Sequence, residues 1–219
     1  MQDQINTATE ILKQGGIILY PTDTIWGIGC DATNEEAVKR IYKLKKRSDS
    51  KSLIVLVDND VRLQRIVAEV PEVAWDIMDY SKKPVTIIYD NPKGIAKSAV
   101  NKDHSLGIRV VKDTFCKKLI SKLNKPIIST SANISGEKQA NCFAEISQEI
   151  KNSVDHIVNL RQDESEPKQS STIIKLDPSG LIKIKSPDSN IFSKFFFLIH
   201  FKLSKNIFIF LFSSTNLAS

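Results

Sequence analysis

GGIILYPTDTIWGIGCDAT, residues 15–33, begins like a buried strand and ends in residues that a buried strand does not contain. The block IILY, residues 17–20, is apolar and rich in β-branched side chains, which is typical of a strand buried on both faces. A proline ends it, and TDT, residues 22–24, then supplies three side chains that can form hydrogen bonds. Gly27 and Gly29 permit a close backbone approach or a positive φ. Both a capped turn and a ligand-binding loop use such residues, so the rest of the chain must decide between them.

Composition places the chain among globular intracellular proteins. Its 219 residues, 41% hydrophobic and 26% charged, suit one large α/β domain and are few for two. The formal net charge of +6 favours an anionic partner, which could be nucleic acid, nucleotide or membrane surface. Three widely spaced cysteines without a CxxC indicate neither a disulfide framework nor zinc, and the polar N-terminus lacks the apolar core of a signal peptide. We therefore expect a cytoplasmic protein.

The hydrophobic periodicity alternates between helical and strand patterns. Glycines 15 and 16 stop the first expected helix, and an asparagine at 34 caps the second. We expect helices over residues 7–14, 34–46 and 116–123, and strands over residues 17–20, 52–57, 85–90, 107–111 and 171–176, with a strand and then a loop over 125–133. This order predicts an α/β domain with a mixed, largely buried sheet.

The C-terminal tail differs from everything before it. Eight of the ten phenylalanines lie between Phe192 and Phe212, and the composition changes near residues 186–190. Because a charged residue at a bilayer centre costs about 2.5–3.5 kcal/mol on insertion scales, Lys202 and Lys205 argue against a stable membrane span. An amphipathic appendage, or a stretch not selected for this fold such as a shifted reading frame, remains open. We therefore divide the chain into a main domain, residues 1–185, in which the function should be sought, and an atypical tail, residues 186–219.

Three further polar clusters follow the opening loop. Lys45, Arg47 and Lys51 gather in LKKRSDSK just beyond the second helix, where they form either a solvated helix end or a phosphate clamp. Arg109 lies within the apolar run LGIRVV, and a buried arginine needs an anion or a carboxylate partner. STSANISG, residues 129–136, directly follows a strand, and ligands of α/β sheets bind at such strand ends.

Several catalytic motifs are absent from the sequence. It contains no GxxxxGK[ST] phosphate loop, no HxxxH or HExxH metal motif, and no GxSxG with a matching histidine and acid. We therefore expect no dedicated protein metal site, and chemistry that depends on positioning charged substrates.

Taken in order, six motifs resemble the YrdC-like family, the threonylcarbamoyl-AMP synthases of transfer RNA modification. They are YPTDTIWGIGCDA, IYKLKKRSDSKSLIVLV, KPVTIIY, LGIRV, PIISTSANISG and SSTII, and the resemblance runs from about Ile5 to Lys185. It implies a single α/β domain of the YrdC/RibB-like type, with a twisted mixed sheet around a deep basic cleft. The implied reaction joins L-threonine, bicarbonate or CO2, and ATP, with Mg2+ bridging the phosphates, and releases pyrophosphate. The product would pass to the machinery that transfers threonylcarbamoyl to tRNA.

The resemblance also implies roles for individual residues, and none of them is an obvious general base. A positioning and electrostatic role falls on Lys45 and Arg47. Lys185 stands where the family usually has an arginine, and lysine cannot form a two-pronged contact to phosphate. SKKPVT replaces the family's Trp-Pro-Gly-Pro turn, and the chain resembles the short form without a second C-terminal domain. The implied threonine contacts are Thr24, Arg109, Ser129 and Ser171, and the implied ATP contacts are Lys45, Arg47, Lys51, Ser105, Ser131, Asn133 and Lys185.

Two other functions are compatible with the charge. One is a non-catalytic module that binds structured RNA through the same basic cleft, and weak RNA binding is also compatible with an enzyme. Against the pure binding module, no set of aromatic residues alternates with the lysines and arginines to stack bases. The other is a carbamoyl-transfer relative with a different acceptor, but the zinc and acylphosphatase-like segments of such multidomain relatives are absent.

Overall fold

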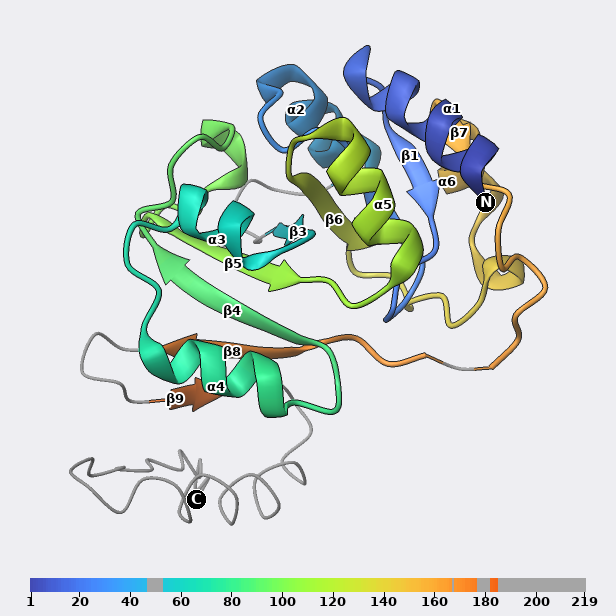
Figure 1. Ribbon diagram of the computed structural model, residues 1–219. Helices are drawn as coiled ribbons and strands as arrows, with labels where there is room; N and C mark the ends of the chain where they lie inside the picture. Colours follow the sequence, from blue (N-terminus) through green and yellow to red (C-terminus); the bar gives the residue numbers. More distant parts are fainter. Residues whose placement is uncertain (47–52, 167, 177–181, 185–219) are drawn as a thin grey trace, which may run out of the picture.

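The computed structural model describes residues 1–46, 53–166, 168–176 and 182–184 (Figure 1). Its helices are α1 (Gln2–Lys13), α2 (Glu35–Leu44), α3 (Asp60–Ile66), α4 (Glu72–Tyr80), α5 (Thr114–Leu123) and α6 (Gln148–Ser153), with short 3₁₀ turns at Lys97–Ala99 and Phe143–Glu145. Its strands are β1 (Ile18–Tyr20), β2 (Gly27–Gly29), β3 (Ile54–Val57), β4 (Val85–Asp90), β5 (Ser105–Val110), β6 (Ile127–Ser131), β7 (His156–Ile157), β8 (Thr172–Leu176) and β9 (Ile182–Ile184).

The described strands form one mixed sheet in the order β7-β1-β2-β6-β3-β5-β4-β8-β9. Three neighbouring pairs are parallel, namely β1 with β7, β3 with β5, and β4 with β8, while the other pairs are antiparallel. Parallel pairs need crossover connections, and the helices between the strands provide them. The prediction of a single α/β domain with a mixed sheet is confirmed.

The two faces of the sheet are covered unequally. One face carries the larger apolar cluster, in which residues such as Leu19, Val55 and Ile108 pack against α2, α3 and α4. On the other face, α1 and α5 lie side by side over Leu56 and Ile127 and form a smaller cluster (Figure 1). The remainder of that second face includes Gly107, Arg109 and Ser129.

Local sequence explains most of the element boundaries. Asn34 caps α2 as expected, because its side chain accepts a hydrogen bond from the backbone N–H of Ala37. The second helix was expected to reach residue 46 but ends at Leu44. The first helix begins at Gln2 and not at Thr7, since the buried residue Ile5 already belongs to its apolar stripe.

No helix within the described ranges combines the length and the apolar composition that a bilayer crossing needs. The tail, residues 186–219, lies outside the described residues. The expectations about its membrane behaviour and its origin therefore stay predictions.

Gly29 is needed because two strands approach closely at its position. It lies in β2 without a positive φ, and a Cβ there would collide with the backbone carbonyl of Ile128 and lie 2.8 Å from Cε1 of Tyr20. We expect Gly29→Ala to lower the free energy of unfolding by about 3 kcal/mol, since a backbone neighbour cannot give way. Gly94→Ala should cost less, because nothing lies within 4 Å of that position and only its φ of +68° opposes a side chain. Urea unfolding compares the variants, and an unchanged midpoint for Gly29→Ala would contradict this account of β2.

Candidate functional site

Arg109 is buried in the middle of the sheet and is held by the loop that follows β1. Its side chain is 2% exposed, and its Nη2 lies 3.2 Å from Oδ1 of Asp23. Its Nη1 donates a hydrogen bond of 3.1 Å to Oγ1 of Thr24. The expectation that a buried arginine has an anionic or carboxylate partner is confirmed, and the partner is a residue to which sequence reasoning assigned no role. The only signal for Asp23 was a carboxylate between two threonines directly after a buried strand.

The loop after β1 is a capped turn, which is one of the two alternatives that its sequence suggested. The hydroxyl of Thr22 accepts from the backbone N–H of Thr24 at 3.0 Å and donates to the carbonyl of Ile25 at 2.7 Å, which is a capped turn. The two threonine hydroxyls lie 2.9 Å apart. A continuous chain of hydrogen bonds therefore runs from Arg109 through Thr24 to the backbone, and it holds the Thr24 hydroxyl in one place.

Strand register brings further candidate residues to the same face as Arg109. Ile54 of β3 is paired with Gly107 on one side and with Ser129 on the other, so Gly107, Arg109 and Ser129 share a face. Ser129 is 5% exposed. A Cβ at Gly107 would lie 3.2 Å from Thr86 and 3.3 Å from Ile54, so the glycine keeps this part of the sheet open.

Thr86 and Ser171 form a hydroxyl pair next to Arg109. The pairing of Ile87 with Ile108 places Thr86, one residue earlier, across from Arg109 on the neighbouring strand. Oγ1 of Thr86 lies 2.7 Å from Oγ of Ser171, and Thr86 is fully buried. The structure thus brings the predicted Ser171 to the Arg109 face. It also adds Thr86, which sequence reasoning missed. The one feature of the sequence that could have indicated Thr86 is a polar side chain within the apolar strand VTIIYD.

Lys45 joins the end of α2 to the segment after β6. Its ammonium donates to the backbone carbonyls of Ser131 and Asn133 at 2.5 and 2.6 Å, and the residue is 2% exposed. The alternative of a solvated, basic helix end is therefore wrong for Lys45. Three predicted residues, Lys45, Ser131 and Asn133, meet here, and the contact fixes the backbone of the Ser-x-Asn segment.

Asn133 and Ser105 differ in how they are placed. The amide of Asn133 donates to the carbonyls of Ile134 and Glu137, both at 2.9 Å, so it orders its own loop. The hydroxyl of Ser105 donates to Asp103 at 2.6 Å and accepts from Asn101 at 3.0 Å. Ser105 lies at the start of β5, about 13 Å along the strand from Arg109. The structure does not bring Ser105 to the Arg109 cluster. This cluster consists of Arg109, its partners Asp23 and Thr24, and the hydroxyl residues Thr86, Ser129 and Ser171 on the same face.

Three predicted nucleotide contacts, Arg47, Lys51 and Lys185, lie outside the described residues. Their roles stay predictions, as does the deep basic cleft that the resemblance implies. Within the described ranges, no three histidine, cysteine, aspartate or glutamate side chains gather as metal ligands.

Burial keeps one tyrosine hydroxyl and two cysteine thiols of the core neutral. It raises the pKa of the Tyr20 hydroxyl and of the Cys30 and Cys116 thiols far above their ordinary values. These groups are therefore neither general bases nor thiolate nucleophiles at neutral pH.

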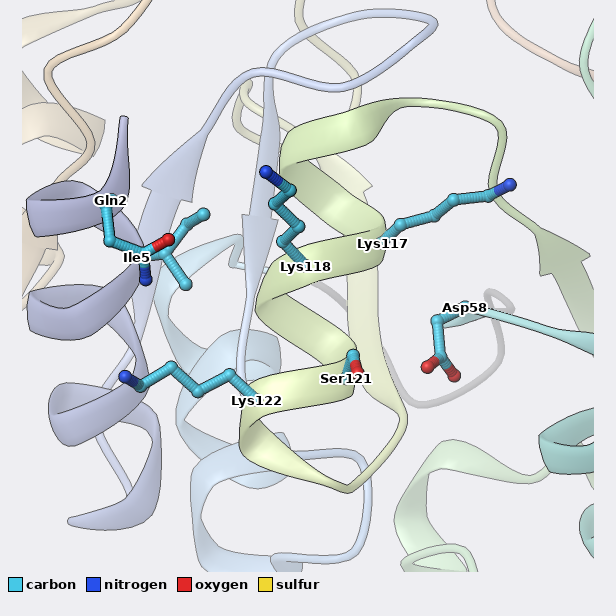
Figure 2. Close-up of a pocket in the computed structure, with 7 residues that line it drawn as sticks. All are labelled: Gln2, Ile5, Asp58, Lys117, Lys118, Ser121 and Lys122. Carbon is cyan, nitrogen blue, oxygen red and sulfur yellow. The ribbon is translucent and has the colours of Figure 1, made fainter.

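A surface depression of about 460 Å3 is lined by residues of α1 and α5 and by Asp58, the residue after β3 (Figure 2). Three lysines of α5 border it, and its one carboxylate, Asp58, is already paired with Arg62. The lining residues are Gln2, Ile5, Asp58, Lys117, Lys118, Ser121 and Lys122. The depression contains none of the residues predicted for the site.

The chain resembles known proteins in sequence and in fold. The family model Sua5_yciO_yrdC, described as telomere recombination, matches residues 10–185. A protein of Pseudoalteromonas translucida named threonylcarbamoyl-AMP synthase is 32% identical over 164 residues, which are 73% of this chain and 88% of the relative. The crystal structure of YciO from E. coli is similar with a TM-score of 0.73 and 25% identity, over 84% of this chain and 89% of that one.

Sua5 of P. abyssi, in a crystal structure complexed with L-threonine, shares the fold with a TM-score of 0.72 at 23% identity. The similarity covers 81% of this chain and 52% of that chain, so the present chain spans about half of the longer protein.

Proposed function

The chain belongs to the Sua5_yciO_yrdC family, and from this premise we propose that it is an L-threonylcarbamoyl-AMP synthase. It condenses L-threonine, bicarbonate or CO2, and ATP, and it releases pyrophosphate. This makes it an enzyme of the nucleotidyltransferase type that serves the threonylcarbamoyl modification of tRNA. Relatives that carry this name, at 32% and 31% identity, support the proposal.

One observation of the structure carries the threonine part of the proposal. Arg109 is almost fully buried, yet its Nε has no hydrogen-bond partner among the described residues. Leaving a buried donor of this kind unsatisfied costs about 1–3 kcal/mol, and more for a charged group. A substrate carboxylate would accept this hydrogen bond. Thr24, Ser129 and Ser171 would supply hydroxyl contacts on the same face.

ATP occupies the neighbouring part of the site in this proposal. Lys45 holds the Ser131–Asn133 backbone in place, and Ser131 and Asn133 line the nucleotide. Arg47, Lys51 and Lys185 stabilise the charge that accumulates on the phosphates as pyrophosphate leaves. Mg2+ would enter with ATP as part of the substrate and would neutralise part of the phosphate charge.

The chemistry proceeds in two steps. The ammonium group of threonine first releases one proton to water, and the free amine then attacks the carbon of CO2 or bicarbonate to form an N–C bond. With CO2 a second proton leaves the nitrogen for water, and with bicarbonate that second proton leaves together with hydroxide as a water molecule. A carbamate oxygen then attacks the α-phosphorus of ATP, and the bond to the β-phosphate oxygen breaks. Alignment of bound reactants can supply about 7–11 kcal/mol of the barrier in well-oriented cases, so no strong base is required for a large rate enhancement.

The product is an acyl phosphate anhydride that water destroys. We infer that it is passed in the cytoplasm to the machinery that transfers threonylcarbamoyl to tRNA. The experiment that tests the proposed function is incubation of the purified protein with Mg2+-ATP, L-threonine and bicarbonate, with pyrophosphate release as readout. Release should require both threonine and bicarbonate, and equal release from ATP alone would contradict the proposal.

A further inference from the structure

Two buried atoms of opposite charge, close to Thr24, form no hydrogen bond with any residue that the structure describes. One is Nε of Arg109, a cationic donor, and the other is Oδ1 of Asp23, an anionic acceptor. They belong to the same ion pair, since Oδ1 lies 3.2 Å from Nη2 of Arg109 without forming a hydrogen bond. Buried polar groups are almost always hydrogen-bonded, so two such atoms in one pair need an explanation.

Two other atoms of the pair form hydrogen bonds. Nη1 of Arg109 donates to Thr24, and Oδ2 of Asp23 lies 3.5 Å from the backbone nitrogen of Lys112, from which it accepts a long hydrogen bond. The buried atoms of the pair without a hydrogen bond to a described residue are therefore one nitrogen of the cation and one oxygen of the anion. A ligand that pairs with both must carry an acceptor and a donor close together.

An anion alone does not suit this arrangement. A phosphate or simple carboxylate would satisfy Arg109, but it would bring a second negative charge toward Asp23. A cation alone would meet the converse problem at Arg109. A zwitterion with neighbouring carboxylate and ammonium groups matches both charges, and free α-amino acids have this structure.

We propose that Asp23 binds the ammonium group of the substrate amino acid while Arg109 binds its carboxylate. This inference rests on the proposed function and adds a residue to its threonine site. Asp23 therefore has two tasks: it neutralises the buried guanidinium, and it makes the site selective for a free amino group over an uncharged substituent.

The experiment combines a change in the protein with the matching change in the ligand. Isothermal titration measures the Kd of L-threonine and of 2,3-dihydroxybutanoate, in which a hydroxyl replaces the ammonium group. Both titrations contain Mg2+ and α,β-methylene-ATP, which cannot release pyrophosphate. The wild-type protein should bind threonine about 10- to 100-fold more tightly than the analogue, as expected for a charged hydrogen bond. In Asp23→Asn this ratio should fall to within about threefold of one.

A matched control removes the carboxylate from a second buried arginine–aspartate pair. Asp58 pairs with Arg62, and their side chains are 6% and 11% exposed, compared with 14% and 2% for Asp23 and Arg109. Asp58→Asn should keep the wild-type preference for threonine over the analogue. Loss of that preference in both variants would show a general effect of unpaired buried arginine, and it would overturn the role of Asp23.

The outcomes separate this inference from the proposed function. A wild-type protein that releases pyrophosphate with threonine but does not distinguish threonine from the analogue overturns the role of Asp23 alone. Full discrimination in Asp23→Asn does the same. If that variant does not fold, Asp23→Glu keeps the charge and should retain a preference of at least threefold, whereas its absence overturns the inference. If the wild-type protein neither binds threonine nor turns it over, the proposed function fails as well.

Discussion

Replacing Arg109 by lysine is expected to lower kcat/KM for L-threonine by at least 100-fold, which corresponds to about 2.7 kcal/mol of transition-state stabilisation. Lysine keeps the charge but loses the planar fork, so one ammonium cannot reach Asp23, Thr24 and a substrate carboxylate together. The measurement is the rate of pyrophosphate release at saturating ATP with varied threonine.

Thr24→Val tests the same contact with no change in charge. It removes the acceptor of the Arg109 hydrogen bond and should raise the KM for threonine. Binding of structured RNA depends mainly on phosphate neutralisation, so its salt-dependent affinity should stay within about twofold, or 0.4 kcal/mol. Normal turnover by both the Arg109→Lys and Thr24→Val variants, together with RNA binding by a wild-type protein that has no threonine-dependent activity, would favour the non-catalytic RNA-binding module.

Replacing Lys45 by methionine is expected to reduce turnover by at least 100-fold and to lower the free energy of unfolding by about 3 kcal/mol or more. Methionine keeps much of the apolar stem of the side chain. It removes the ammonium that holds the carbonyls of Ser131 and Asn133, and the Ser-x-Asn segment loses its fixed conformation. Urea unfolding and steady-state kinetics measure the two effects separately.

Lys43→Met is the control for this second prediction. Lys43 lies two residues earlier in α2 and is exposed, so its replacement should change the free energy of unfolding by no more than about 0.5 kcal/mol. Wild-type unfolding and wild-type turnover in Lys45→Met would show that the buried contact has no role in ordering the site.

Sequence reasoning predicts those parts of this fold that short-range physics determines. The strand VTIIYD was expected over residues 85–90, and β4 has these bounds, because β-branched alternation is a local property. The cap of α2 by Asn34 could be predicted for the same reason. Helices α3 and α4 were not predicted. The first has seven residues and the second nine, and such short helices depend on packing against the sheet more than on their own propensity.

The residues of the candidate site were likewise predictable from local sequence, whereas their distant partners were not. Arg109 could be selected from the sequence because a charge within an apolar strand is costly anywhere. Its partner Asp23 lies 86 positions away, and the paired residues Thr86 and Ser171 are 85 positions apart along the chain. Which strands become neighbours, and in which register, is decided by the whole sheet. These partners therefore became visible only in the fold.

The central claim is that one active site joins threonine, an inorganic carbon and the AMP part of ATP. Its most direct test is incubation of the protein with Mg2+-ATP, L-threonine and 13C-bicarbonate, followed at once by mass spectrometry of the nucleotide products. The account predicts an AMP adduct that contains threonine and one 13C atom, formed together with pyrophosphate and absent when threonine is omitted. Threonyl-AMP without the label, or AMP and pyrophosphate formed at the same rate without threonine, would contradict it.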